Sequence, residues 1–151
     1  MCSINKGKIK FYGVPLTMAP AAADTIIRFL NDTKTEPHDY DMILTGDLGS
    51  VGSELLKDLC KKDYSVDISG VHKDCGTMIY DLENQDVYSG GSGCGCSGAV
   101  VNSYIMNRLS RKTLKRVLFV GTGALLSPTS TLQGESIPGI AHGVLLSGED
   151  A

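Results

Sequence analysis

The strongest strand signal in this chain is the run VLFVGTG at residues 117–123, in which four apolar residues are closed by Gly121 and Gly123. A shorter apolar run at residues 42–44 ends at Gly46 and is typical of a buried strand. Residues 140–146 carry the pattern of a last strand. Because segments with helical periodicity alternate with these runs, the sequence predicts an α/β fold, a layered mixed sheet with helices on its faces.

Helical periodicity predicts three helices. The first covers residues 21–30 and has Pro20 in its first turn, where proline is tolerated. The second follows Ser50 or Ser53, two candidate N-caps, and the third covers residues 95–109. The residues expected to face inward from these helices are Ile26, Ile27, Leu30, Leu55, Leu56, Leu59, Val100, Val101, Tyr104, Ile105 and Leu109.

Length and composition fit one globular domain. The chain has 151 residues, of which 42% are hydrophobic and 21% charged. We expect a tail at residues 1–7, a domain at residues 8–147 and a second tail at residues 148–151. Weaker signals within the domain predict an edge strand at residues 8–14 and a strand at residues 77–80.

Charge and hydropathy exclude several classes of function. The net charge is −3 and the 14 Lys and Arg are thinly spread, so no basic stripe can neutralise phosphates and no nucleic acid is expected. No stretch approaches the roughly 20 apolar residues that span a bilayer, and residues 1–10 lack the apolar run of a signal peptide. We therefore expect a soluble chain, or one held at a membrane through partners. Its five cysteines are interpreted as reduced thiols.

The segment GGSGCGCSG at residues 90–98 is the most unusual stretch. Its glycines fit the GxGxxG spacing of dinucleotide sites, but a clear preceding strand and an acidic residue about 20 positions later are both missing. Glycine also suits tight turns and close approach of the backbone. A helix that starts here would point free N–H groups outward, where they could receive an anion.

Cys94 and Cys96 lie within this segment. One C-x-C pair supplies two ligands where a structural zinc ion needs four, so no metal site is predicted. A helix N-terminus lowers the pKa of a thiol, and either cysteine could then act as a nucleophile if a base were positioned beside it.

The three histidines are interpreted as structural residues, and His72 with Asp74 as a paired surface group. Asp47 follows the strand at residues 42–44, in the glycine-flanked turn GDLG. We expect its carboxylate to cap the following helix, and contact with a ligand is the alternative.

Five longer motifs carry a resemblance to a known family. They are MAPAAADT (18–25), ILTGDLG (43–49), GGSGCGCS (90–97), GTGALLSP (121–128) and QGESIPGIAH (133–142). Over residues 8–146 the chain resembles the stage V sporulation protein AD family. The resemblance implies a thiolase-like fold of two similar halves, of which this chain is similar only to the C-terminal half.

The resemblance also implies a function without catalysis. The family is described as a non-enzymatic member of its fold that binds dipicolinic acid, as the calcium salt in the spore. It serves movement of this compound into the forespore and its release at germination. Condensing enzymes of the same fold place a histidine after the strand that matches residues 43–49, and an Asn or second histidine in the turn that matches residues 90–97. Neither is present here.

We therefore expect no enzyme activity, no catalytic residues and no cofactor, because nothing would stabilise a thioester enolate. The nucleophilic cysteine of condensing enzymes belongs to the other half. The alternatives are an acyl-transferring enzyme similar to thiolases and ketoacyl synthases, with Cys94 or Cys96 as the nucleophile, or a structural remnant.

Ligand contacts are expected from three turns, at residues 46–49, 90–97 and 121–128. The candidate ligand-binding residues are Gly46, Asp47, Gly93, Cys94, Gly95, Cys96, Gly123 and Ser127. The expected partners are dipicolinic acid, with or without calcium, and membrane-embedded sporulation proteins. The helix near residues 50–60 or that at 95–109 is expected to pair in a homodimer or with an N-terminal half. The expected location is the forespore or spore, soluble or peripheral to the inner membrane.

Overall fold

The computed structural model describes residues 15–125, 127–134 and 137–148, and the predicted edge strand at residues 8–14 lies outside these ranges. The strands are β1 (Met42–Thr45), β2 (His72–Asp74), β3 (Arg116–Ala124) and β4 (Gly139–Ser147). The helices are α1 (Pro15–Thr33), η1 (Pro37–Asp39), α2 (Gly49–Tyr64), α3 (Cys75–Met78), α4 (Cys94–Val100), η2 (Val101–Ile105), α5 (Met106–Ser110) and α6 (Pro128–Leu132).

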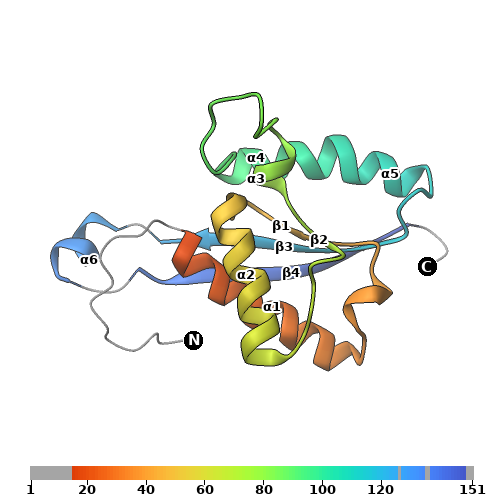
Figure 1. The fold of residues 1–151 in the computed structure, drawn as a ribbon, viewed down its shortest axis with the longest axis horizontal. Helices are drawn as coiled ribbons and strands as arrows, with labels where there is room; N and C mark the ends of the chain where they lie inside the picture. The colour runs from red at the N-terminus through yellow and green to blue at the C-terminus, as the bar shows by residue number, and fades with distance from the viewer. Residues whose placement is uncertain (1–14, 126, 135–136, 149–151) are drawn as a thin grey trace.

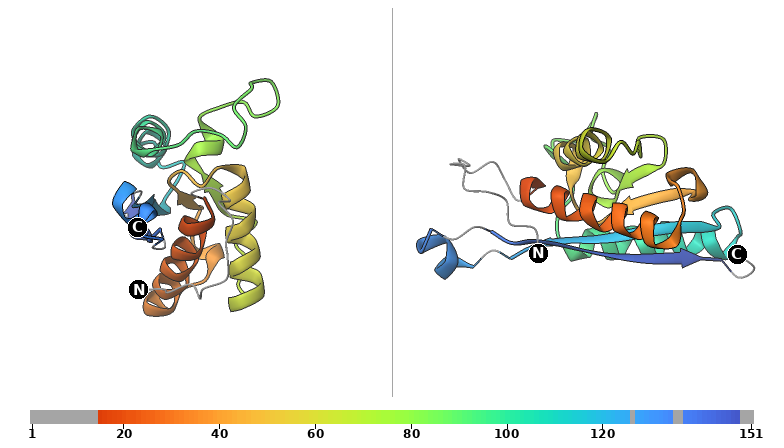
Figure 2. Two further views of the ribbon diagram at one scale, coloured as in Figure 1. Left: turned by 90° about the vertical axis from the view of Figure 1, so that its left-hand side faces the viewer. Right: turned by 90° about the horizontal axis from the view of Figure 1, so that it is seen from below.

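The four strands form one mixed sheet in the order β2-β1-β3-β4. Strand β1 pairs in parallel with β2 and β3, and β4 runs antiparallel to β3. Helices α1 and α2 cover one face of the sheet, while α4, η2 and α5 cover the other (Figures 1 and 2). The expectation of a layered mixed α/β fold is confirmed.

Alternation along the strands divides the interior into two cores, because successive side chains point to opposite faces. Ile43 and Leu118 pack with α1 and α2 on one face. Met42, Leu44 and Val117 pack with α4, η2 and α5 on the other. Strand β1 is therefore buried on both faces, as its uninterrupted apolar run predicts.

Helix α1 is longer than predicted and contains Pro20 in its interior, not in its first turn. Proline removes the N–H that would bond the carbonyl of residue 16, and its ring crowds that carbonyl, close to the start of α1. Ala19 and Ala23 on either side of Pro20 are at most 1% exposed. We infer that burial of this small-residue face offsets the lost hydrogen bond.

The predicted strand at residues 77–80 is wrong, because the strand in this region is β2 and α3 follows it directly. The carboxylate of Asp74 accepts a hydrogen bond from the N–H of Gly76 and so caps α3. Strand β3 continues through both glycines to Ala124, because β4 pairs with it residue by residue along its whole length.

A π-helical turn, η2, joins α4 to α5 and shifts the buried face of the predicted third helix. In a regular α-helix Val100 and Tyr104 would share a face, since they are four residues apart. The wider π turn instead brings Ile105 under Val100, and both are at most 5% exposed. Tyr104 is 37% exposed, so its predicted burial is wrong.

Candidate functional site

The three segments predicted to contact a ligand meet at one carboxylate, that of Asp47. Asp47 belongs to the first segment and bonds to Gly93 of the second and to Thr122 of the third. Asp47 follows β1, Ser92 and Gly93 immediately precede α4, and Thr122 lies within β3. Because β1 and β3 run parallel with Thr45 beside Val120, the next residues along each strand lie side by side. We call this set, with Gly46, the Asp47 junction.

Hydrogen bonds hold the junction together. Thr122 donates its hydroxyl to Asp47 Oδ1 at 2.8 Å, and the N–H of Gly93 donates to Oδ2 at 2.7 Å. The Ser92 hydroxyl lies 3.5 Å from the same Oδ2. The N–H of Asp47 donates in turn to Thr122 Oγ1 at 3.2 Å. Asp47 thus binds the loop before α4 and does not cap α2, so the predicted cap is wrong.

Gly46 permits this close approach of three elements. A Cβ added at Gly46 would lie 2.9 Å from Thr122 Oγ1 and 3.0 Å from the hydroxyl of Ser97 on α4. Both distances are too short for a side chain to fit without displacing a neighbour. The glycine after β1 is therefore a packing requirement of the junction.

A second, buried carboxylate lies beneath the junction. Asp74, at 1% exposure, accepts from the N–H groups of Leu48 and Gly49 at 2.9 Å each, and from Gly76 as above. It therefore caps α2 and α3 together, a role that the sequence assigned to Ser50 or Ser53 for α2. Burial raises the pKa of the Asp74 carboxyl, and these hydrogen bonds and that from Thr45 act against the shift.

A chain of buried polar groups links Asp74 and His72, both on β2, through Thr45 on β1. Thr45 Oγ1 lies 2.6 Å from Asp74 Oδ1 and 3.0 Å from His72 Nε2. A hydroxyl has one proton, so donation by Thr45 to Asp74 requires His72 to donate through Nε2. This direction assigns a neutral imidazole with its proton on Nε2.

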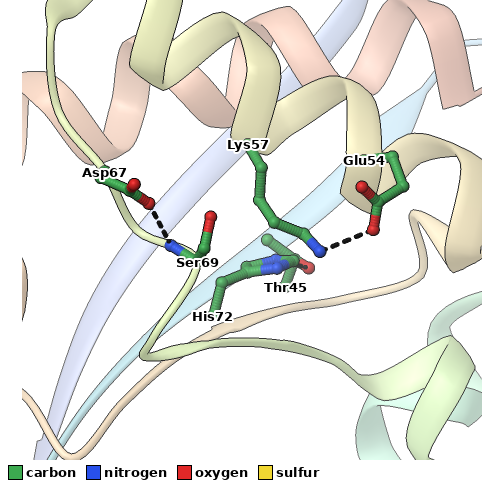
Figure 3. Close-up of polar contacts among 6 residues, drawn as sticks. All are labelled: Thr45, Glu54, Lys57, Asp67, Ser69 and His72. Atoms are coloured by element: carbon green, nitrogen blue, oxygen red, sulfur yellow. Dashed lines mark hydrogen bonds and ion pairs between the residues drawn. The ribbon is translucent and has the colours of Figure 1, made fainter.

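His72 is buried, and burial is the main cause that lowers its pKa to about 4. The ammonium of Lys57, which pairs with Glu54 at 2.6 Å, lowers this pKa further (Figure 3). The prediction that His72 is structural agrees with this chain of bonds. The prediction that His72 and Asp74 form a surface pair is wrong, because both side chains are buried.

The remaining candidate residues do not all gather at the junction. Gly93 caps α4 with φ of 88°, a left-handed value that favours glycine, and Cys94 and Gly95 follow it on the surface. Cys96 is buried in the core beside Cys75, and burial raises the pKa of its thiol. Gly123 faces Ile140 of β4.

Ser127 lies apart, directly before α6 at the tip of the β3–β4 hairpin, which extends beyond the layers of the fold (Figure 1). Sequence reasoning missed Thr122 and Ser92 at the junction and Thr45 beneath it. Thr45 had a usable signal, since it is a polar residue that directly extends the buried run Met42 to Leu44.

Three further observations concern the described residues. They contain no group of three or more His, Cys, Asp or Glu that could hold a metal ion. A groove of about 700 Å³ lies away from the junction and is lined by the C-terminal part of α1, by η1 and by the loop of residues 65–71. None of the candidate residues lines it, so the hydrogen-bonded junction is the candidate site. No helix among the described residues is long and apolar enough to cross a membrane.

The fold and the junction define an α/β protein whose polar site lies at the carboxyl ends of parallel strands, the usual place for ligands in such sheets. A family model described as stage V sporulation protein AD matches residues 5–147, and the chain belongs to this family. It is 52% identical over 128 residues to the stage V sporulation protein AD of Bacillus subtilis (strain 168). The match covers 85% of this chain and 37% of that relative, so the chain spans well under half of the relative's length.

Proposed function

We propose that this chain is a non-enzymatic sporulation protein that binds dipicolinic acid and serves its movement into the forespore and its release at germination. Membership of the stage V sporulation protein AD family supports the sporulation role. We further propose that the four-stranded mixed sheet is the C-terminal half of a thiolase-like fold. The convergence of three segments on Asp47 carries the proposal, because it gives a single polar site at the strand ends.

Charge at the junction favours the calcium salt as the bound form. The Asp47 carboxylate already lies at the N-terminus of α4, where a ligand carboxylate would otherwise be attracted. The segments 46–49, 90–98 and 121–124 contain no Lys or Arg to clamp a dianion. Calcium binds carboxylate, hydroxyl and carbonyl oxygens, so a calcium ion carried by dipicolinate would turn the repulsion by Asp47 into attraction.

Calorimetric titration with dipicolinic acid, with and without calcium, tests this proposal. We expect saturable binding that is at least about tenfold tighter with calcium. Asp47→Asn keeps the size of the side chain and removes its charge, and it should abolish most of the calcium dependence. Asp63→Asn, an exposed acid on α2, is the matched control. Absence of saturable binding by the folded chain under either condition would contradict the proposed site.

The proposed absence of catalysis has its own test. Cys96 is buried with a raised pKa, which disfavours a thiolate, so Cys94 is the better candidate for an acyl-transferring nucleophile. Incubation with an acyl-CoA should leave both thiols unmodified as judged by intact mass. Stoichiometric acylation that Cys94→Ser prevents would support the enzyme instead.

For partners we propose pairing through the α4–α5 helix with a second copy or with a separate half, together with membrane-embedded sporulation proteins. Met106 on α5 and Ile140 and Val144 on β4 support an interface, since these apolar side chains are 44%, 54% and 51% exposed. The proposed location is the forespore or spore, at the inner membrane through those partners. Light scattering that finds a monomer at high concentration would contradict the homodimer.

A further inference from the structure

Residues 77–90, which begin within α3, form a closed loop that projects from the body before α4 (Figures 1 and 2). The N–H of Gly91 donates to the carbonyl of Gly76 at 2.8 Å and closes its base. A side chain at Gly76 would collide with the carbonyl of Gly91, and one at Gly90 would collide with that of Gly76. The ends of the loop are therefore as close as two backbones can be, which is the geometry of an Ω-loop.

Internal hydrogen bonds give this loop a fixed shape. The Asp81 carboxylate accepts from the N–H groups of Glu83 and Asn84 at 3.1 and 3.3 Å and from the Asn84 amide at 2.8 Å. The N–H of Asp81 donates to the Gln85 side chain at 2.9 Å. The hydrogen bond from the Asn84 side chain is the main cause that lowers the pKa of Asp81. On the other side, the N–H of Ser50 in α2 holds the carbonyl of Ser89 at 2.8 Å.

Large apolar and aromatic side chains project from this ordered loop. Tyr88 is 94% exposed, and Tyr80, Ile79 and Leu82 are 44%, 38% and 36% exposed. Tyr88 also has a left-handed backbone with φ of 50°, which is rare for an aromatic residue. Exposed tyrosines on a preorganised loop are the side chains that dominate binding energy at protein interfaces, because little entropy is lost when they are buried.

The charge of the loop has one sign. Asp81, Glu83 and Asp86 are exposed, and the sequence contains no Lys or Arg between Lys73 and Arg108. An acidic surface of this kind repels anionic lipid headgroups and nucleic acid and attracts a cationic segment. The exposed tyrosines add a face on which Arg and Lys bind through cation–π contact.

We propose that the loop of residues 77–90 docks a Lys- and Arg-rich protein segment that carries an apolar anchor. The inference rests on the proposed function for its source of partners, since the cytoplasmic loops of membrane-embedded proteins are enriched in Lys and Arg. The acidic side chains attract the segment, and Tyr88 and Tyr80 pack against its anchor and its cations. The loop thus holds this chain at membrane proteins without contact with the lipid.

Fluorescence anisotropy with a labelled peptide rich in lysine and arginine around a central phenylalanine tests the proposal. The full chain should bind this peptide saturably, more weakly as salt rises, and should not bind the same peptide with glutamate at every basic position. The double variant Glu83→Gln with Asp86→Asn should weaken binding about tenfold. Its matched control, Asp32→Asn with Asp63→Asn, removes the same charge from exposed positions elsewhere and should leave binding unchanged.

The aromatic contribution is tested with Tyr88→Asn, since asparagine tolerates the left-handed backbone at this position. We expect at least about tenfold weaker binding, with Tyr64→Asn on α2 as the control at another exposed tyrosine.

Equal losses in loop and control variants, or no peptide binding at all, would overturn the proposal. So would sedimentation with phosphatidylglycerol vesicles that the loop variants reduce, because the occupant would then be lipid. The loop variants should retain the calorimetric response to dipicolinic acid, so failure here is distinct from failure of the proposed function.

Discussion

Acid should destabilise this protein through His72, which is buried in its neutral form. The side chain donates to Thr45 at 3.0 Å, and its pKa is lowered from 6.5 to about 4. Below pH 6.5 the histidine of the unfolded chain binds a proton that the buried imidazole does not take up until about pH 4. The free energy of unfolding therefore decreases as pH falls through this window, and the stability is fully present only above pH 6.5.

The magnitude follows from the shift. A drop from 6.5 to about 4, at about 1.4 kcal/mol for each pH unit, amounts to about 3 kcal/mol. Asp74 contributes with the opposite sign, because burial raises the pKa of its carboxyl and the folded state then retains a proton that the unfolded state has released. Acids with lowered pKa values, such as Asp67 and Asp81, contribute in the same direction as His72, so a variant that lacks only the imidazole is needed to isolate its contribution.

His72→Gln provides that variant, since its amide can still donate to Thr45 and does not titrate. Urea unfolding across pH 4 to 6.5 should show the wild type losing about 3 kcal/mol more than this variant. His38→Gln is the control, because the side chain of His38 is 76% exposed beside Glu36. Equal pH dependence in the wild type and in His72→Gln would refute the assignment of a buried neutral imidazole.

Four further predictions concern the junction and the core. Thr122→Val removes the hydroxyl that binds Asp47 and should lower the free energy of unfolding by about 1–2 kcal/mol, whereas Thr122→Ser should not; urea titration measures both. Gly46→Ala should lower the free energy of unfolding by about 1–3 kcal/mol in the same assay, since its Cβ would lie 2.9 Å from Thr122 Oγ1. Gly70→Ala is the control and should not lower it in this way, because no atom lies within 4 Å of its added Cβ. Ser53→Ala should stabilise the protein by about 1 kcal/mol, because its buried hydroxyl has no partner among the described residues; a lower midpoint would contradict this. Iodoacetamide should modify the exposed Cys94 in the folded protein, and mass spectrometry should find the buried thiols protected until urea is added; these are Cys60, Cys75 and Cys96.

The parts of the fold that depend on local patterns could be predicted from the sequence. The runs around Leu44 and Leu118 are apolar because their strands are buried on both faces, and that signal is complete within a few residues. The residue that caps α2 could not be predicted from local sequence, because Asp74 accepts from the N–H of Gly49 across 25 residues of sequence. The serines near the expected helix start favoured a local cap, but the distant carboxylate of Asp74 takes that place in the structure.

The same distinction explains the error at Tyr104. A period of 3.6 residues groups Val100 with Tyr104, and only the π turn of η2 replaces that pair by Val100 and Ile105. The sequence VNSYI contains no pattern that predicts a π-helical turn. The side chain of Asn102 donates to the carbonyl four residues earlier at 2.8 Å, a contact available to asparagine in any helix. The turn places Val100 and Ile105 together in the core beside Leu44 and Val117, and these contacts lie far from the segment in sequence.

At the site, the sequence singled out three segments but could not say how they contact one another, and the third, residues 121–128, begins within β3. Asp47 was expected either to cap a helix or to contact a ligand, and its hydrogen bonds now join β3 to the start of α4. A carboxylate that accepts from the N–H of Gly93 already places a negative charge at the N-terminus of α4, where an incoming anion would otherwise bind. Under the proposed function, a dianionic ligand would therefore have to displace Asp47 or arrive with its own cation. Displacement would break the 2.7 Å and 2.8 Å bonds, whereas a calcium ion can share the carboxylate and leave both in place. This difference is why calcium dependence, and its loss in Asp47→Asn, is the decisive measurement on the site.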